Sequence, residues 1–238
     1  MNSVWIMVPT FNEIHNIPDL ARGLKRSLPG SKCLIVDDSS PDGTADKVRT
    51  MKRKGFQVDL LVRPFKLKGR GWAGRDGFLE CLRRGADIVV EMDADLSHDP
   101  RFLTALLKPI QTGAADVVLG SRYIPGGQDE DRPWFRAWIS RFARVYLNLV
   151  LGLGVADPTT GYRAYSRNAL EALQPNTLRA RDPFCVTEIL YRSRQRGLRI
   201  MEIPIRFKDR QKGLSKLRGG TLLAYLGRVL LLRLTGKA

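Results

Sequence analysis

The chain has 238 residues, of which 43% are hydrophobic and 27% charged, and these values indicate a folded globular protein rather than a disordered one. Its 40 Lys and Arg against 24 Asp and Glu give a formal net charge of +16, which favours an anionic partner: a nucleic acid, a membrane surface or a phosphorylated ligand. The length suits a single domain over residues 1–238, and we expect neither a secretory signal peptide nor a transmembrane helix.

The first half of the chain alternates short β-branched runs with helical patterns. Strands are expected at residues 4–9, 32–38, 58–63, 87–92 and 115–121, and helices near 14–28, 43–54, 72–84 and 100–112. Strands separated by single helices predict a mostly parallel sheet with helices on both faces. In such sheets ligands bind beyond the carboxyl ends of the strands, so the loops that follow the strands are the expected site.

After about residue 130 the pattern changes. In order, the sequence predicts a long helix at 132–153, a loop at 154–167, a helix near 184–196, a strand at 199–207, a basic loop, and a leucine-rich tail at 219–236. The long helix and the tail mix Leu and aromatic residues with Arg, which suits helices that lie at a membrane interface. Ordinary core packing with a solvated basic face is the alternative for both segments.

The stretch DADLSHDP places acidic residues directly after a run that is typical of a buried strand. Asp93 and Asp95 can turn toward one hard cation, because Mg²⁺ commonly takes one or two protein carboxylates and completes its shell with water and phosphate oxygens. A solvated turn is the alternative, since Asp-x-Asp is a common sequence. Asp99, which precedes Pro100, is expected to cap a helix, and His98 to serve loop packing rather than metal binding.

Two further loops carry acids at the ends of predicted strands. The segments PTFNE (9–13) and VDDSSPDGT (36–44) place them where nucleotide-binding α/β folds hold ribose hydroxyls or a base edge. Gly69 and Gly71 form a basic glycine loop, which alone is a weak signal. The sequence has no Walker A motif and no GxGxxG after the first strand, which disfavours an NTPase or a dinucleotide enzyme.

Taken together, these segments resemble a known family. In order, from about residue 4 to about residue 220, the chain contains VPTFNE, IVDDSSPDGT, EMDADLSHDP, GSRY, DPTTGYRAY and DRQKGLSKL. This series is similar to that of the inverting glycosyltransferases of family 2, and most closely to the dolichyl- or polyprenyl-phosphate mannose synthases. The resemblance implies an α/β GT-A fold, Rossmann-like, with a mostly parallel central sheet and C-terminal amphipathic helices.

The resemblance also implies roles for individual residues. A nucleotide-sugar donor would be contacted by Pro9, Phe11, Glu13, Val36 and Asp38, and its diphosphate by Asp93, Ala94 and Asp95. The donor phosphates would be surrounded by Arg122, Arg210 and Lys216, which together with Asp95 form the implied catalytic set. The phosphate of a lipid acceptor would be received by Arg136 and Ser140. The metal, Mg²⁺ or Mn²⁺, would be held by Asp93, Asp95 and Ser97.

Three positions depart from the family pattern. Phe11 stands where many members have Tyr, and Ser97 stands where some have Gln, which weakens the case for a third metal ligand. Arg70 lies in GRG where GLG is usual, and its role stays open. The role of Glu188 also stays open, between the acceptor side of the site and an ordinary buried or capping function.

The implied reaction transfers mannose from GDP-mannose to dolichyl or polyprenyl phosphate with inversion. An enzyme of this kind is expected on the cytoplasmic face of a membrane, peripherally bound, and small membrane-protein partners stay open. The acceptor phosphate needs little help from a general base, because its second pKa is about 6.

Two alternatives remain. A transferase that uses a UDP-sugar is the nearer one, since the acidic loop handles a diphosphate that both donors share. A nucleic-acid-binding protein is remote, because the basic residues are scattered and no aromatic RNA-binding signature is present.

Overall fold

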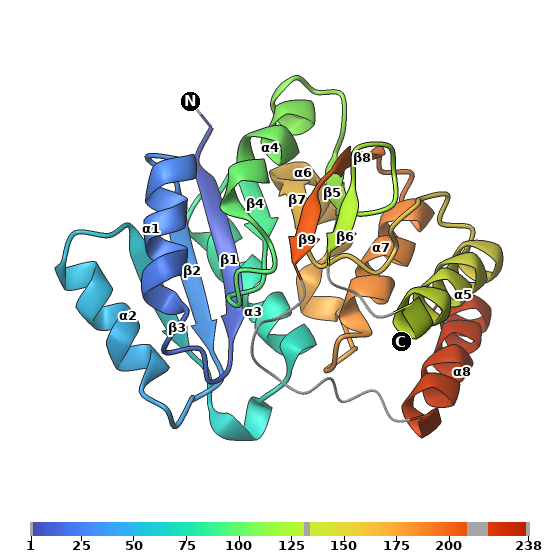
Figure 1. Cartoon of the computed structure of the whole chain (residues 1–238), viewed down its shortest axis with the longest axis horizontal. Coiled ribbons are helices and arrows are strands. Elements are labelled where there is room, and N and C mark those ends of the chain that lie inside the picture. Colours follow the sequence, from blue (N-terminus) through green and yellow to red (C-terminus); the bar gives the residue numbers. More distant parts are fainter. Residues whose placement is uncertain (1, 131–133, 209–218, 237–238) are drawn as a thin grey trace.

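A seven-stranded sheet forms the centre of the chain in the computed structural model, which describes residues 2–130, 134–208 and 219–236, apart from the side chains of 134–139 and 219–223. Its strands are β1 (Val4–Thr10), β2 (Lys32–Asp37), β3 (Val58–Val62), β4 (Ile88–Glu91), β5 (Val117–Ser121), β7 (Arg163–Ser166) and β8 (Ile200–Pro204). Their spatial order is β3-β2-β1-β4-β7-β5-β8. Only β7 runs antiparallel to its neighbours, so the predicted, mostly parallel sheet is confirmed (Figure 1).

Helices cover both faces of this sheet. They are α1 (Ile17–Ser27), α2 (Thr44–Arg53), α3 (Arg70–Arg83), α4 (Leu103–Gln111), α5 (Trp134–Leu151), α6 (Arg167–Leu173), α7 (Cys185–Gln195) and α8 (Gly219–Thr235). Two short strands, β6 (Gln128–Glu130) and β9 (Arg206–Lys208), pair in parallel as a separate ribbon. The helices expected near 14–28, 43–54, 72–84, 100–112 and 184–196 are confirmed, although α3 begins two residues earlier than expected, at Arg70.

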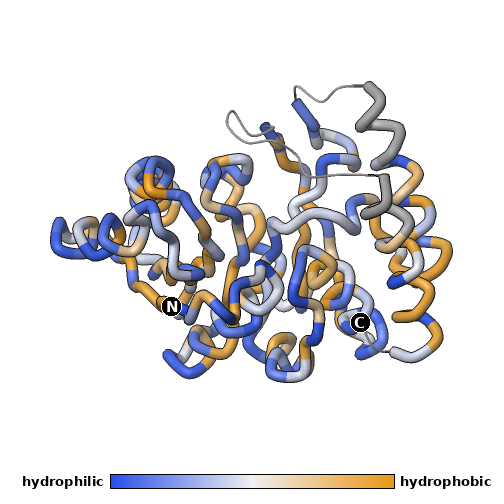
Figure 2. The backbone as a smooth tube through the Cα atoms, turned by 90° about the horizontal axis from the view of Figure 1, so that it is seen from below, coloured by the Kyte–Doolittle hydropathy of each residue, from blue (hydrophilic) through white to orange (hydrophobic). Residues whose placement is uncertain are grey.

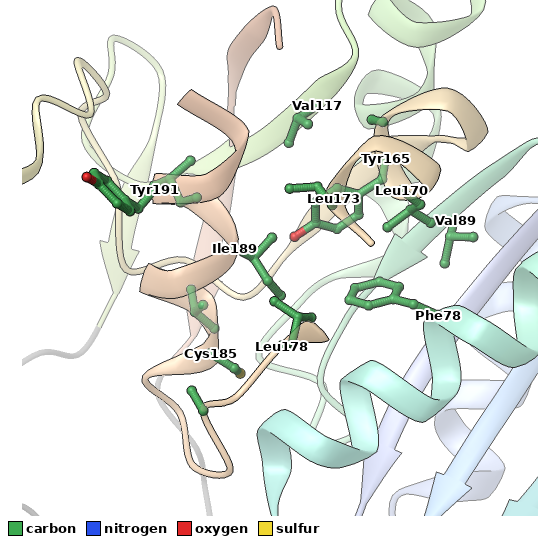
Figure 3. Close-up of a cluster of buried hydrophobic side chains, with 14 of the residues drawn as sticks. Phe78, Val89, Val117, Tyr165, Leu170, Leu173, Leu178, Cys185, Ile189 and Tyr191 are labelled. Atoms are coloured by element: carbon green, nitrogen blue, oxygen red, sulfur yellow. The ribbon is translucent and has the colours of Figure 1, made fainter. Parts of the chain in front are cut away.

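The core consists of two hydrophobic clusters, one on each face of the sheet. Along β1, Ile6 and Met7 are both buried but belong to opposite clusters, as the two-residue period of a strand requires. One cluster packs the sheet against α1, α2 and α4, and the other against α3, α6 and α7 and, farther out, α5 and α8. Figure 3 shows the second cluster, where Phe78 of α3 meets the ring of Tyr165 edge-on with centroids 5.3 Å apart.

Two predictions about the second half of the chain were wrong. Residues 154–167, expected as a loop, contain β7, which lies between β4 and β5 and pairs with both. The single strand expected at 199–207 is divided at Ile205, so that β8 joins the main sheet and β9 joins the ribbon. At the division the Ile205 N–H donates to the Ser121 carbonyl oxygen at 3.0 Å, its own carbonyl oxygen accepts from the Gln128 N–H at 2.9 Å, and its buried side chain packs against Gly120.

Helices α5 and α8 lie side by side at one end of the molecule (Figure 1). The Tyr146 hydroxyl on α5 donates a hydrogen bond of 3.0 Å to the Leu226 carbonyl oxygen on α8. Figure 2 shows hydrophobic stretches in this helix pair, near the C-terminus. Within the described ranges, no helix has both the length and the apolar composition needed to cross a bilayer.

Candidate functional site

The loops after β1 and β2 are bound to each other at the carboxyl edge of the sheet. The backbone N–H of Asn12 donates to the Ser40 hydroxyl at 2.9 Å, and the N–H of Glu13 donates to the Thr44 hydroxyl at 3.0 Å. These bonds bring together two loops that the sequence analysis assigned separately to a nucleotide pocket. The strand β4, which carries the acidic loop, pairs with the other side of β1, so all three loops share one edge.

Left-handed backbone conformations concentrate in these same loops. Of the four described non-glycine residues with positive φ, three lie here: Asn12 at 62°, Ser39 at 53° and Leu96 at 63°. Such conformations are costly for residues with a side chain, and they cluster at binding and catalytic sites. These backbone conformations are therefore evidence that the functional site lies at the carboxyl edge of the sheet.

The acidic loop is held in shape by its own side chains. One carboxylate oxygen of Asp95 accepts hydrogen bonds from the Ser97 backbone N–H at 3.1 Å and from the Ser97 hydroxyl at 2.6 Å. The backbone N–H of Asp93 donates to Nδ1 of the buried His98 at 3.0 Å, and the His98 ring stacks on Tyr162 with centroids 4.9 Å apart. Ser97 thus orients Asp95, and its predicted role as a metal ligand stays a prediction.

His98 is a packing residue, as the sequence analysis expected. Burial lowers the pKa of His98 below its ordinary value, although the neighbouring Asp93 and Asp95 act in the opposite direction. The imidazole is therefore neutral near pH 7, which leaves Nδ1 able to accept the Asp93 bond. The predicted cap at Asp99 is also confirmed, because its carboxylate accepts from the Arg101 backbone N–H at 2.9 Å at the start of the 3₁₀ turn before α4.

The N-terminus of α3 connects two of the acidic loops. The backbone N–H of Gly69 donates to the Asp38 carboxylate at 2.8 Å. The guanidinium of Arg70 donates to Glu91 at 2.5 Å and to Asp93 at 3.2 Å. Although burial opposes the charge, Glu91 and Asp93 raise the pKa of Arg70 above its ordinary value. Arg70, whose role the sequence left open, therefore stands as a fixed cation beside the acidic loop.

The loop that enters β7 closes the other side of the site. Arg122 forms a two-pronged ion pair with the buried Asp157, at 2.7 and 2.9 Å, and also donates to the Thr159 hydroxyl at 2.9 Å. Burial alone would raise the pKa of Asp157, but hydrogen bonds and charge from Arg122 lower it below its ordinary value. In this arrangement Arg122 holds the loop, and its proposed contact with donor phosphates stays a prediction.

The buried Arg163 fixes the same loop from behind. Its guanidinium donates to the carbonyl oxygens of Thr160 at 2.8 Å, Val186 at 2.7 Å and Pro158 at 3.0 Å. These partners belong to the loop before β7 and to α7, so one side chain ties both to the sheet. The sequence analysis did not single out this residue.

Glu188, whose role was open, has a structural one. Its fully buried carboxylate accepts from the backbone N–H of Ala180 at 2.9 Å and pairs with Arg192 at 2.6 Å. It therefore anchors the segment before α7. That segment in turn lies against the start of α3, where the Gly71 N–H donates to the Arg181 carbonyl oxygen at 2.9 Å.

The residues implied for donor binding differ in how they are placed. The partly buried group comprises Pro9, Phe11, Glu13, Asp93 and Asp95, whereas Val36, Asp38 and Ala94 are buried. The Val36 side chain packs in the core beside Gly77. The Asp38 carboxylate is occupied by Arg63 and Gly69, so it shapes the site rather than facing open space.

The remaining implied residues are only partly described. Ser140 lies on α5 and is half-buried. The Arg136 side chain, Arg210 and Lys216 lie outside the described residues.

The acidic loop suits a divalent metal that is completed by a ligand. Among the described residues, no cluster of three or more His, Cys, Asp and Glu side chains could hold a metal ion. Asp93 and Asp95 instead offer hard oxygen donors on one short loop, which is the donor set that Mg²⁺ or Mn²⁺ combines with phosphate oxygens and water. The residues present therefore fit a metal that binds with a phosphorylated ligand.

Replacing Gly71 with alanine should destabilise the protein by about 2 kcal/mol or more. A Cβ at this position would overlap the Ala180 carbonyl oxygen and lie 2.8 Å from the Cβ of Cys185. Gly227→Ala on α8 is the matched control, because nothing lies within 4 Å of its Cβ position, and it should be neutral or stabilising by up to about 1 kcal/mol. Urea denaturation of both variants measures the difference, and equal stabilities would contradict the close approach at Gly71.

The loops at this edge of the sheet lie in a region that matches a known protein family. The family model described as "Glycosyl transferase family 2" matches residues 5–174, which include every loop described above up to the end of α6. The chain belongs to glycosyltransferase family 2. As a member of this family it is an enzyme, and the family resemblance read from its motifs is confirmed.

This glycosyltransferase is similar to several curated relatives. It is 40% identical to the undecaprenyl-phosphate mannosyltransferase of Micrococcus luteus over 91% of this chain and 88% of that protein. It is 37% identical to the polyprenol monophosphomannose synthase of Mycolicibacterium smegmatis, over 91% of this chain and 82% of that protein. A dolichol-phosphate mannosyltransferase of Pyrococcus furiosus is 33% identical, and the glycosyltransferase described here spans 61% of its length.

A solved structure has the same fold. The glucosyl-3-phosphoglycerate synthase of Mycobacterium tuberculosis, determined with Mn²⁺, UDP-glucose and phosphoglyceric acid, superposes with a TM-score of 0.68 over the whole chain and 81% of that protein. At 21% identity this likeness concerns the fold of the glycosyltransferase alone.

Proposed function

We propose that this protein transfers mannose from GDP-mannose to a polyprenyl phosphate, with inversion at the sugar carbon and with Mg²⁺ or Mn²⁺ at the acidic loop. The strongest support is the identity of 40% and 37%, over 91% of the chain, to two enzymes named for mannose transfer to polyprenyl carriers. The identity favours mannose over the glucose of a UDP-sugar, since the acidic loop itself does not discriminate between donors.

The chemistry is a single displacement. An oxygen of the acceptor phosphate forms a bond to the anomeric carbon of mannose, and the bond from that carbon to the donor diphosphate breaks, so that GDP leaves with the electron pair. The phosphate monoester is largely ionised at neutral pH, with a second pKa of about 6, and it attacks without a protein base. Catalysis then consists of aligning the two substrates and stabilising the charge on the leaving diphosphate.

The described residues support specific parts of this scheme. A divalent metal on Asp93 and Asp95 would neutralise charge on the leaving diphosphate. Phe207 on β9 lies against His98, with ring centroids 5.7 Å apart, and so brings the end of that strand to the acidic loop. Arg210 and Lys216, which follow β9 in the sequence, are proposed to bind the donor phosphates, because Arg and Lys both bind phosphate.

The experiment that tests the function is transfer of radiolabelled mannose from GDP-mannose to a short polyprenyl phosphate, with and without Mg²⁺ or Mn²⁺. Metal-dependent formation of lipid-phosphate-mannose is the expected result. UDP-glucose is run in parallel as the competing donor, and a polyprenol without phosphate as the control acceptor. Activity with UDP-glucose and none with GDP-mannose, in folded protein, would overturn the choice of mannose.

We also propose that the exposed side of α5 and α8 rests on a membrane surface. Among the described side chains of the two helices, the large apolar ones that are exposed are Phe142, Val145, Leu149, Leu230, Leu231 and Leu234, which we call the α5–α8 apolar face. On the same helices Arg141 and Arg233 are exposed. Exposed apolar side chains beside arginines are typical of helices at an interface with anionic lipid, and an enzyme that acts on a lipid phosphate must reach it there.

Removing this face should reduce membrane binding without loss of folding. Leu149 and Leu234 are 79% and 82% exposed, so the double substitution L149E/L234E should weaken binding to anionic vesicles at least about tenfold, because each buried Leu contributes about 1.5–3 kcal/mol. Flotation with vesicles at low salt gives the measurement. Leu79→Glu on α3, also exposed, is the control, and equal binding of both variants would refute the proposed face.

A further inference from the structure

The Arg70 guanidinium lies within the group of carboxylates that the proposed metal would join. It donates to Glu91 at 2.5 Å and to Asp93 at 3.2 Å, and Glu91 itself is buried. The pair is enclosed on two sides. A Cβ at Gly161 would lie 3.3 Å from Arg70, and one at Gly74 would lie 3.5 Å from Glu91. The Arg70 side chain nevertheless keeps 21% of its surface exposed, so an arriving ligand can reach the guanidinium.

We propose that Arg70 acts as a resident counter-charge, so that the acidic loop binds a divalent metal strongly only together with a nucleoside diphosphate. This inference rests on the proposed function only in assuming that the acidic loop binds a metal and a diphosphate together. Arg70 is proposed to make metal binding depend on nucleotide binding, whichever sugar is transferred.

The electrostatic reasoning has two parts. Without a nucleotide, the positive Arg70 repels an incoming dication and already occupies one oxygen of Asp93, so the metal alone binds weakly. When a diphosphate arrives, its negative oxygens attract both the metal and the guanidinium, and Arg groups pair readily with phosphate oxygens. The same residue thus opposes the metal alone and favours the metal with the nucleotide, which is a coupling between two ligands.

A leucine at this position, as in the GLG pattern, would lack this property. It would also leave the buried Glu91 without its counterion, which is strongly destabilising. A clean test therefore starts from Glu91→Gln, whose side-chain oxygen still accepts from Arg70 but carries no charge. Adding Arg70→Leu to that variant removes the cation without stranding a buried carboxylate, and Arg70→Lys in the same variant keeps the charge.

The measurement is Mn²⁺ binding to the whole chain, followed by the electron paramagnetic resonance of free Mn²⁺, first without nucleotide and then with GDP or UDP. We expect R70L/E91Q to bind Mn²⁺ alone about tenfold more tightly than E91Q, because one charge–charge repulsion across a few ångströms has about that size. R70K/E91Q should behave like E91Q. The increase in Mn²⁺ affinity caused by GDP or UDP should be smaller in R70L/E91Q than in E91Q.

Two results would overturn the proposal. One is equal Mn²⁺ affinity of E91Q and R70L/E91Q without nucleotide, with folding of both verified by circular dichroism. The other is an undiminished effect of GDP or UDP on Mn²⁺ affinity in R70L/E91Q. Neither result depends on sugar transfer, so a protein that fails the mannose assay can still confirm or refute the role of Arg70.

Discussion

Asp95→Asn should lower the turnover number for mannose transfer by about 10²–10³-fold while leaving the fold intact. The substitution removes the negative charge that is proposed to hold the metal. The side-chain oxygen of Asn can still accept the two hydrogen bonds that Ser97 donates to Asp95, so the loop should keep its shape. Initial rates at saturating donor and acceptor give the measurement, and thermal unfolding followed by circular dichroism gives the stability.

Asp99→Asn provides a control with the same change in charge, four residues along the chain. Asp99 caps the turn before α4, and asparagine caps helices as well as aspartate does. This variant should retain most of its activity. A rate for Asp95→Asn within tenfold of the unmodified protein would remove Asp95 from the proposed metal site, whereas equal losses in both variants would point to general disruption of the loop.

Arg163→Met should destabilise the protein by about 3–5 kcal/mol, because three buried carbonyl oxygens lose their hydrogen-bond donor and an unsatisfied buried group costs about 1–3 kcal/mol. Methionine fills similar space but donates no hydrogen bonds. The carbonyl oxygens of Pro158, Thr160 and Val186 would then lose the donor that satisfies them in the buried interior. The free energy of unfolding from urea denaturation gives the measurement.

Arg199→Met serves as the comparison for the same chemical change at the surface. Arg199 is exposed and pairs with Asp116, and pairs of this kind contribute between about 0 and 1 kcal/mol. A loss at Arg163 no larger than that at Arg199 would mean that water or other groups satisfy the three carbonyl oxygens. We expect a large loss of stability at Arg163, whose buried guanidinium holds a loop, and a small loss at Arg199, whose ion pair is exposed.

The first half of the fold could be predicted because its strands are continuous β-branched runs between helical patterns. β7 could not, because Arg163–Ser166 is only four residues long and lacks a β-branched run, and it pairs on both edges, with β4 and β5. The division of the 199–207 run had no local signal either. Ile205 looks like any residue of a strand, but its N–H bonds to Ser121 in the main sheet whereas its carbonyl oxygen accepts from Gln128 in the ribbon.

In the candidate site, the role of a residue could be predicted most directly where its partners are close to it in the sequence. The cap at Asp99 follows from the neighbouring Pro100 and Arg101 and is confirmed. The expectation that His98 packs rather than binds a metal is also confirmed, although its ring partner, Tyr162, lies far away in the sequence. Arg70 and Glu188 could not be assigned, because their partners come from other elements or from the backbone of another segment. Arg70 meets Glu91, 21 positions away, and Glu188 binds the backbone before α7. Long-range partners of this kind leave no periodic trace in a sequence.

The place of β7 in the sheet has a consequence for the order in which the chain folds. The strands β3, β2, β1 and β4 can pair once residue 91 has emerged from the ribosome, but β5 and β8 join them only through β7. Closure of the sheet therefore waits for contacts between residues such as Glu91 and Arg163, which are 72 positions apart, and long-range contacts form slowly. We expect a nascent chain to carry its acidic loop exposed until residue 166 has emerged, so that the second half of the chain completes a site whose Asp93 and Asp95 lie in the first.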